Sequence, residues 1–173
     1  MKNIAVIYKS KYGSAKQYAE WIAEALNAQA FDSSSINLSK LSDYDIVIYG
    51  GGLYAGRING VKPITKANCK QLVLFTVGLE HTTAEDCSEI LAKSFTAEQL
   101  SVIKAFHFPG SLDYEKMGLI HKGMMAIVKK EADKKPIAER NKFDNFVIET
   151  YGKSVNYVDR SEITTLVEYV RGL

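Results

Sequence analysis

The residues best suited to chemistry lie in three short segments, each of which follows an apolar run typical of a buried strand. Residues 10–15 read Ser-Lys-Tyr-Gly-Ser-Ala, residues 50–57 hold four glycines with Tyr54 and Arg57, and residues 76–79 read Thr-Val-Gly-Leu. Hydroxyl groups, a lysine and backbone N–H groups at the start of a helix favour an anion such as a phosphate. A glycine-rich segment lets a flat ligand approach the backbone, and a tyrosine there can stack on its ring.

Two of these segments also have plain structural interpretations. Residues 10–15 are compatible with a tight strand-to-helix turn in which Ser14 is the N-cap. Residues 50–57 are compatible with a surface loop. Four glycines in seven positions cost backbone entropy on folding, and this cost favours the interpretation as a binding loop.

The elements that must position these segments alternate along the chain. Continuous apolar runs predict buried strands, and helical spacing of apolar residues predicts amphipathic helices between them. The predicted strands are 4–8, 30–31, 36–38, 46–49, 72–77 and 102–108, of which 30–31 and 36–38 are weak. The predicted helices are 14–26, part of 60–68, 83–94, 114–131 and a last one that begins after 159–161. This alternation predicts an α/β fold with a parallel sheet between two helical layers, and ligands bind such sheets at the carboxyl ends of the strands.

The three segments together resemble the FMN-contacting loops of the flavodoxin superfamily. S-x-Y-G-S-A, Y-G-G-G-L-Y-A-G and T-V-G-L carry the resemblance, which extends over nearly the whole chain and is strongest to the flavodoxin-domain group that includes menaquinone-dependent protoporphyrinogen IX dehydrogenase. It implies a doubly wound, five-stranded parallel sheet of order 2-1-3-4-5 in a three-layer α/β/α domain, with FMN as the cofactor. The cofactor-binding residues that it implies are Ser10, Lys11, Tyr12, Gly13, Ser14, Ala15, Gly51, Gly52, Leu53, Tyr54, Ala55, Gly56, Thr76, Val77, Gly78 and Leu79.

Ala15 departs from the family pattern, because members usually carry a threonine at this position of the phosphate loop. Loss of one hydroxyl hydrogen bond is expected to weaken FMN binding by about 1 kcal/mol. Lys11 or Lys16 can offset part of this loss. A domain that has lost FMN and serves only as an interaction module remains an alternative.

Histidines are the candidates for proton handling. His81 lies in a strand-end loop that faces the expected cofactor, so His81 and the adjacent Glu80 are the predicted catalytic residues. His107, inside a predicted strand, is expected to be a core residue whose hydrogen bonds are satisfied. His121 is expected to lie on the polar side of its helix. Cys69 and Cys87 form no metal-binding spacing, and no metal site is predicted.

The predicted function is electron transfer through bound FMN, as an oxidoreductase linked to a quinone or a porphyrinogen. The alternative is a flavodoxin-type electron carrier that has no small-molecule substrate of its own. Carriers usually present an acidic surface around the flavin, whereas this chain has a formal net charge of +2. A redox protein or a quinone is the expected partner, and no nucleic acid is expected.

The net positive charge is concentrated in residues 114–142, which hold eight Lys or Arg and four acidic residues. We expect one domain over 1–173, with an extra helix and basic loop at about 114–142 in which the methionines fill the core. This basic segment is either a solvated face or a peripheral contact with an anionic membrane surface. The expected location is the cytoplasm, with the inner face of the membrane as an alternative. The apolar residues of its helix are Met117, Leu119, Ile120, Met124, Ile127 and Val128.

Overall fold

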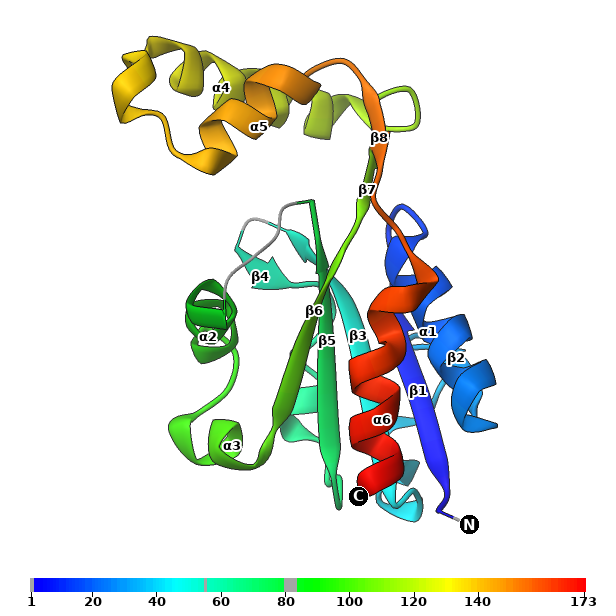
Figure 1. Ribbon diagram of the computed structural model, residues 1–173. Helices are drawn as coiled ribbons and strands as arrows, with labels where there is room; N and C mark the ends of the chain where they lie inside the picture. The colour runs from blue at the N-terminus through cyan, green and yellow to red at the C-terminus, as the bar shows by residue number, and fades with distance from the viewer. Residues whose placement is uncertain (1, 55, 80–83) are drawn as a thin grey trace. The chain divides into compact units, whose positions relative to one another are not determined.

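The computed structural model describes residues 2–54, 56–79 and 84–173 (Figure 1). The chain divides into two compact units: unit 1 is Met1–Gly110 with Val158–Leu173, and unit 2 is Ser111–Tyr157. The expectation of one domain over 1–173 stays a prediction, because a division into compact units does not show whether either unit folds alone.

Unit 1 is built on a parallel sheet. Its five parallel strands lie in the order β2 (Gln29–Asp32), β1 (Ile4–Lys9), β3 (Ile46–Tyr54), β5 (Leu72–Gly78) and β6 (Lys104–Pro109). A short strand, β4 (Arg57–Ile58), pairs antiparallel with the end of β3. The order of the five parallel strands confirms the predicted order 2-1-3-4-5.

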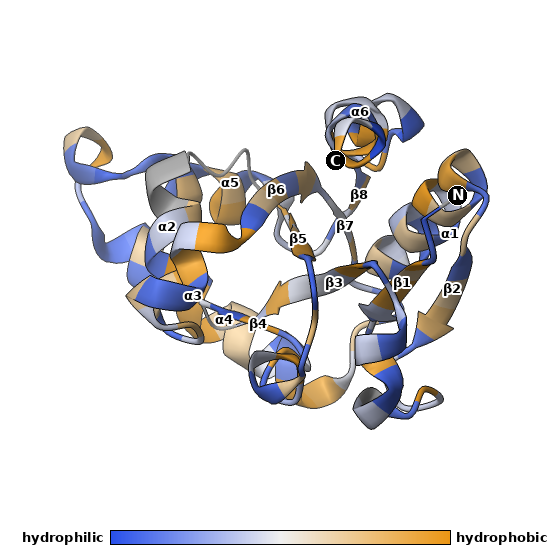
Figure 2. Cartoon of the chain, turned by 90° about the horizontal axis from the view of Figure 1, so that it is seen from below, coloured by the Kyte–Doolittle hydropathy of each residue, from blue (hydrophilic) through white to orange (hydrophobic). Residues whose placement is uncertain are grey.

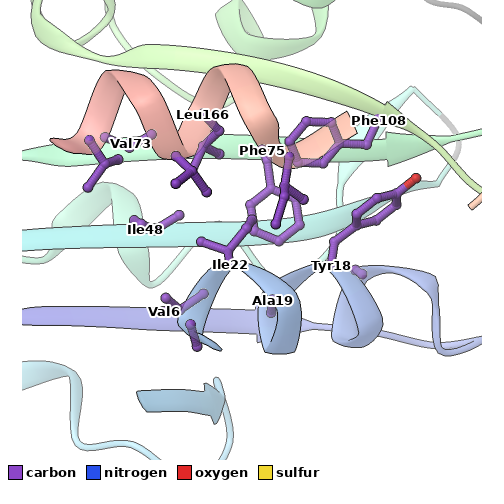
Figure 3. Packing of buried hydrophobic residues seen from close by; sticks show 14 of the residues in the cluster. Val6, Tyr18, Ala19, Ile22, Ile48, Val73, Phe75, Phe108 and Leu166 are labelled. Carbon is purple, nitrogen blue, oxygen red and sulfur yellow. The ribbon is translucent and has the colours of Figure 1, made fainter. Parts of the chain in front are cut away.

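Helices cover both faces of this sheet and confirm the three-layer α/β/α architecture (Figure 2). On one face, α1 (Ser14–Leu26) and α6 (Thr164–Gly172) pack against strand residues such as Val6 and Ile48 (Figure 3). On the other face, a second core cluster contains Ala5 and Ile7 of β1 together with Leu41, Ile64 and Leu91, the last of which belongs to α2 (Ala84–Ala92). Successive side chains of a strand point to opposite faces, so one continuous apolar run supplies both cores.

Four predictions of elements in unit 1 are wrong. The predicted strand 36–38 is absent, and a 3₁₀ helix, η1 (Leu38–Asp43), follows instead with Asn37 as its N-cap. Only a single 3₁₀ turn, η2 (Ile64–Lys66), forms in the predicted helix within 60–68. The third parallel strand does not end at its glycines but continues to Tyr54, because Gly50 and Gly51 pair with both β1 and β5. The helix before β6 is α3 (Ala97–Val102), which includes Val102, predicted as the first residue of that strand.

Unit 2 begins and ends in a two-stranded antiparallel ribbon of β7 (Ser111–Asp113) and β8 (Ser154–Asn156). Between these strands lie α4 (Leu119–Lys134), the 3₁₀ turn η3 (Ile137–Glu139) and α5 (Lys142–Thr150). The sequence pattern missed α5, whose start is defined by a capping box between Asn141 and Asp144. Within the described residues, no helix is both long and apolar enough to cross a membrane.

The side chains of α4 correct the expectation that its apolar residues form a core. Met117, just before the helix, is buried, but Leu119, Ile120 and Ile127 are largely exposed and Met124 is 39% exposed. Met124 is therefore not a core filler.

Candidate functional site

The strand register of unit 1 brings the three predicted segments to one edge of the sheet. Lys9, at the end of β1, is paired with Gly51 of β3, and Gly51 is in turn paired with Thr76 of β5. The carboxyl ends of these three neighbouring parallel strands therefore lie side by side, and the segments that follow them start from adjacent positions.

The first segment forms a tight turn into α1. Gly13 is the N-cap and has φ of 100°, a left-handed conformation that favours glycine. Its N–H donates to Ser10 Oγ at 3.0 Å, and its carbonyl accepts from Gln17 N at 2.9 Å. Ser14 is thus the first helical residue, and the interpretation of Ser14 as N-cap is wrong.

The start of α1 is open to a ligand. No side chain caps this end of the helix within the described part of the chain. A Cβ atom at Gly13 would have no described heavy atom within 4 Å. Uncapped N–H groups at the positive end of a helix dipole form a favourable environment for a phosphate group.

Ala15 points away from this opening. Its side chain is 3% exposed and belongs to the core cluster that also contains Tyr18 and Ile22. The alanine side chain therefore contributes to packing, and only the backbone of this residue is placed to contribute to anion binding. The expected cost of the missing threonine hydroxyl stays a prediction.

The glycines of the second segment have different roles. A Cβ at Gly50 would lie 1.8 Å from Phe75 Cζ, and a Cβ at Gly51 would lie 2.7 Å from Ile58 Cγ2. These two glycines are required by packing inside the protein. At Gly52, by contrast, a Cβ would meet no atom of the described residues within 4 Å. The interpretation that glycine makes room for a ligand therefore applies to Gly52 and not to Gly50 or Gly51.

A hairpin holds Tyr54 in place at the end of β3. Asn59 N donates to Gly52 O at 2.9 Å, and the Tyr49 hydroxyl donates to Asn59 O at 2.7 Å. Burial of Tyr49, with a smaller effect of Asp32, raises the pKa of its phenol above the ordinary value. Sequence reasoning missed Tyr49 and Asn59, because only the fold shows that they support the segment that carries Tyr54.

Lys11 links the first and second segments. Its Nζ lies 5.9 Å from the ring centroid of Tyr12 and 5.4 Å from that of Tyr54, within cation–π distance. The two tyrosines are 42% and 43% exposed. Partial burial, followed by the effect of Tyr54, raises the pKa of Tyr12 above its ordinary value. The structure thus brings together an ammonium group and two accessible aromatic rings.

Most of the third segment turns towards the protein interior. Thr76 and Val77 are buried, and Thr76 Oγ1 lies 2.8 Å from His107 Nδ1. A Cβ at Gly78 would come within 3.0 Å of His107 Cε1 and 3.3 Å of Leu53 Cδ1. His107 thus has a hydrogen-bond partner in Thr76, as predicted, but it is half-buried and not part of the core. Gly78 allows strands β5 and β6 and the end of β3 to approach closely.

Three predicted site residues, Ala55, Glu80 and His81, lie outside the described residues. Leu79 is described and half-buried at the end of β5. Among the residues that are described, no group of three or more His, Cys, Asp or Glu side chains is arranged to hold a metal ion.

The first two segments carry positive charge. Residues 1–19 and 46–79 contain no Asp or Glu, whereas Lys11 and Arg57 lie within the two segments themselves. Asp32, at the end of the neighbouring strand β2, has its carboxylate 3.4 Å from Lys9 Nζ. Hydrogen bonds from Ser34, with a smaller effect of Lys9, lower the pKa of Asp32.

Among models of protein families, that of the flavodoxin domain matches residues 5–138 of the chain. No curated protein matches it.

Solved structures with similarity to the chain include a flavodoxin, WrbA-like protein from Agrobacterium tumefaciens, with 18% identity over 69% of this chain and 87% of that one and a TM-score of 0.47. A flavoprotein in complex with FMN from Lactobacillus acidophilus has 11% identity, covers 62% and 91% of the two chains, and has a TM-score of 0.45. Flavodoxin 1 from Bacillus cereus has 16% identity, with coverage of 65% and 88% and a TM-score of 0.42. These identities are too low to transfer a ligand.

Proposed function

The chain belongs to the flavodoxin domain family, and we propose that it binds FMN at the carboxyl edge of the unit 1 sheet and transfers electrons through the flavin. The observation that carries this proposal is the open backbone at Gly13 and Gly52 beside Lys11 and two accessible tyrosine rings. When bound, FMN supplies one- and two-electron chemistry, so the protein needs to supply binding, orientation and electrostatics.

The first segment fits the phosphate end of FMN. The uncapped N–H groups at the start of α1 and the hydroxyl groups of Ser10 and Ser14 are suitable donors to phosphate oxygens. Lys11 adds a positive charge in the same turn, which attracts the dianionic phosphate.

The second and third segments fit the flavin ring. Tyr54, and Tyr12 beside it, offer aromatic faces for stacking, and the bare backbone at Gly52 allows a flat ring to lie close to β3. Gly78 ends the adjacent strand β5, Leu79 follows it, and the two residues complete the edge along which the ring would lie.

Titration of the apoprotein with FMN, followed by quenching of flavin fluorescence, tests this proposal. We expect saturable binding, which Tyr54→Ala weakens by about 0.5–1.5 kcal/mol through loss of stacking. Tyr157→Ala is the matched control, because Tyr157 in unit 2 is 48% exposed and Tyr54 is 43% exposed. A wild-type protein that does not take up excess FMN would overturn the proposal.

We propose further that the flavin serves an oxidoreductase acting on a quinone or a porphyrinogen rather than a carrier between proteins. The support is electrostatic: the segments that surround the site are basic, whereas an acidic rim is the usual docking surface of a carrier. Stopped-flow mixing of the reduced protein with a menaquinone analogue distinguishes the two roles. An enzyme gives a rate of reoxidation that saturates with quinone concentration, and a carrier gives slow, unsaturable reoxidation.

Glu80 and His81 are proposed to handle protons in this reaction, by their position after β5 in the sequence. His81→Ala should lower turnover with the quinone while leaving FMN affinity unchanged. Unchanged turnover would remove His81 from the mechanism.

A further inference from the structure

The exposed side of helix α4 in unit 2 is unusually apolar. Leu119 is 86% exposed, Ile120 79%, Ile127 66% and Met124 39%. Ile120, Met124 and Ile127 are spaced i, i+4 and i+7, so they lie on one face of the helix. Exposed single apolar residues are common, but a contiguous row of this kind marks an interaction surface.

This row is not the face by which α4 stabilises unit 2. Ala132 is buried and Val128 is half-buried, and these two residues lie on the adjacent face of the helix, because residues four apart follow one another along the helix surface. Helix α4 contacts α5. The helix therefore carries one apolar face for its own unit and, beside it, a second one that stays exposed. Folding of unit 2 explains the first face and leaves the second without a role.

The segment that carries the outward face, residues 114–142, is predominantly positive. Lys129 forms an ion pair with Asp133, Lys134 with Glu131 and Lys135 with Asp144, so the charges of these three lysines are balanced. Within unit 2 as described, Lys122, Lys130 and Lys142 take part in none of the ion pairs. The surplus of four positive charges over 114–142, eight basic against four acidic residues, is thus borne by the same helix and its neighbours.

We propose that the outward face of α4 docks unit 2 onto the surface of an anionic lipid bilayer. Isoleucine, leucine and methionine side chains would enter the boundary between headgroups and acyl chains, and the lysines would contact anionic headgroups. The row and the exposed Leu119 together present roughly a few hundred Å², which is less than the roughly 800 Å² per partner of a typical stable interface between proteins. The size of the face and its charge both favour a membrane surface over a second copy of the chain.

Vesicle flotation of the full chain tests this inference without any measurement of the flavin. We expect binding to vesicles of phosphatidylglycerol and phosphatidylcholine and much weaker binding to phosphatidylcholine alone. The double variant Ile120→Gln/Ile127→Gln should lower the partition coefficient about tenfold or more, since it removes two of the inserting side chains. Lys130→Gln should lower binding less and reduce its dependence on salt.

Val102→Gln is the matched control, because Val102 is 70% exposed but lies on α3 of unit 1. It should bind vesicles like the wild type. Far-UV circular dichroism checks that the double variant is folded, which its exposed positions lead us to expect. Absence of binding by the wild type, or equal binding by the double variant, would overturn the inference. So would sedimentation showing a dimer that the double variant dissociates, because the face would then be covered by a second copy.

Discussion

Gly50 and Gly52 lie two positions apart in β3, yet the structure gives them different reasons to be glycine. At Gly50 the phenyl ring of Phe75 occupies the place of a side chain, whereas the position of a side chain at Gly52 is open in the described structure. Packing of the core explains the first glycine, whereas the open position of the second fits the proposed contact of FMN with the backbone.

This difference predicts opposite effects of two identical substitutions. Gly50→Ala should lower the free energy of unfolding by about 1–3 kcal/mol, because the new methyl group overpacks the core against Phe75. Gly52→Ala should leave stability within about 0.5 kcal/mol of the wild type but weaken FMN binding. Urea unfolding and FMN titration of both variants check this. Equal loss of stability in the two variants would contradict the assignment of Gly52 to the ligand.

Among the elements, the ribbon of β7 and β8 depends on one carboxylate. Asp113 forms an ion pair with Lys116 at 3.1 Å, and its Oδ1 accepts hydrogen bonds from Ser154 Oγ at 2.9 Å and from Glu115 N at 3.0 Å. The hydrogen bond from Lys116, with a smaller effect of the one from Ser154, lowers the pKa of Asp113 to about 2. The charged carboxylate thus ties the two strands of the ribbon together.

The lowered pKa makes the ribbon sensitive to acid. A carboxyl group whose pKa is lower in the folded than in the unfolded state stabilises the fold above about pH 4, and this stabilisation is lost as the pH falls towards about 2. NMR spectra of the amides of β7 and β8 should therefore show the ribbon opening over this range. In Asp113→Asn the ribbon should be weaker at neutral pH and should lack this step. A step of the same size in the variant would assign it to another carboxylate.

At the scale of the whole molecule, unit 1 contains its own core. Both apolar clusters of the sheet consist only of residues of unit 1, from Ile4 to Phe108 and from Val158 to Val170. Unit 2 enters and leaves through one ribbon, in which Ser111 is paired with Asn156. The ends of unit 1 at Gly110 and Val158 are thus brought close together by adjacent strands, whose Cα atoms are about 5 Å apart.

Removal of unit 2 tests whether this core is sufficient. A chain in which a short Gly-Ser linker replaces 111–157 should fold cooperatively and bind FMN, because the three loops and their supporting strands all belong to unit 1. Thermal unfolding and FMN titration measure both properties. A deleted chain that does not fold would show that the two units are one domain, as the sequence analysis expected.

Much of the fold of unit 1 is predictable because buried parallel strands have a simple sequence pattern. The apolar runs around Val6, Ile48 and Leu74 are continuous, since both faces of the sheet are covered by helices. The helix α5 was missed because its capping box lies in a polar stretch and the helix has only nine residues, too few for a clear helical pattern of apolar residues. The strand β3 was predicted too short because glycine, which is unfavourable in strands, is tolerated where the ladder continues on both sides.

The sequence by itself determined the class of fold and the three segments that follow the buried strands. These depend on local composition and on the spacing of apolar residues, which can be read along the chain. The order of the parallel strands was an implication of the resemblance to the flavodoxin superfamily, and the structure confirms it. Only the tertiary structure decided that Gly50 is filled by Phe75 while Gly52 is open, that Lys11 joins Tyr12 to Tyr54, and that the apolar row of α4 faces outward. Each of these depends on which distant residues become neighbours, and a periodic pattern shows that a helix has an apolar face without showing what covers it.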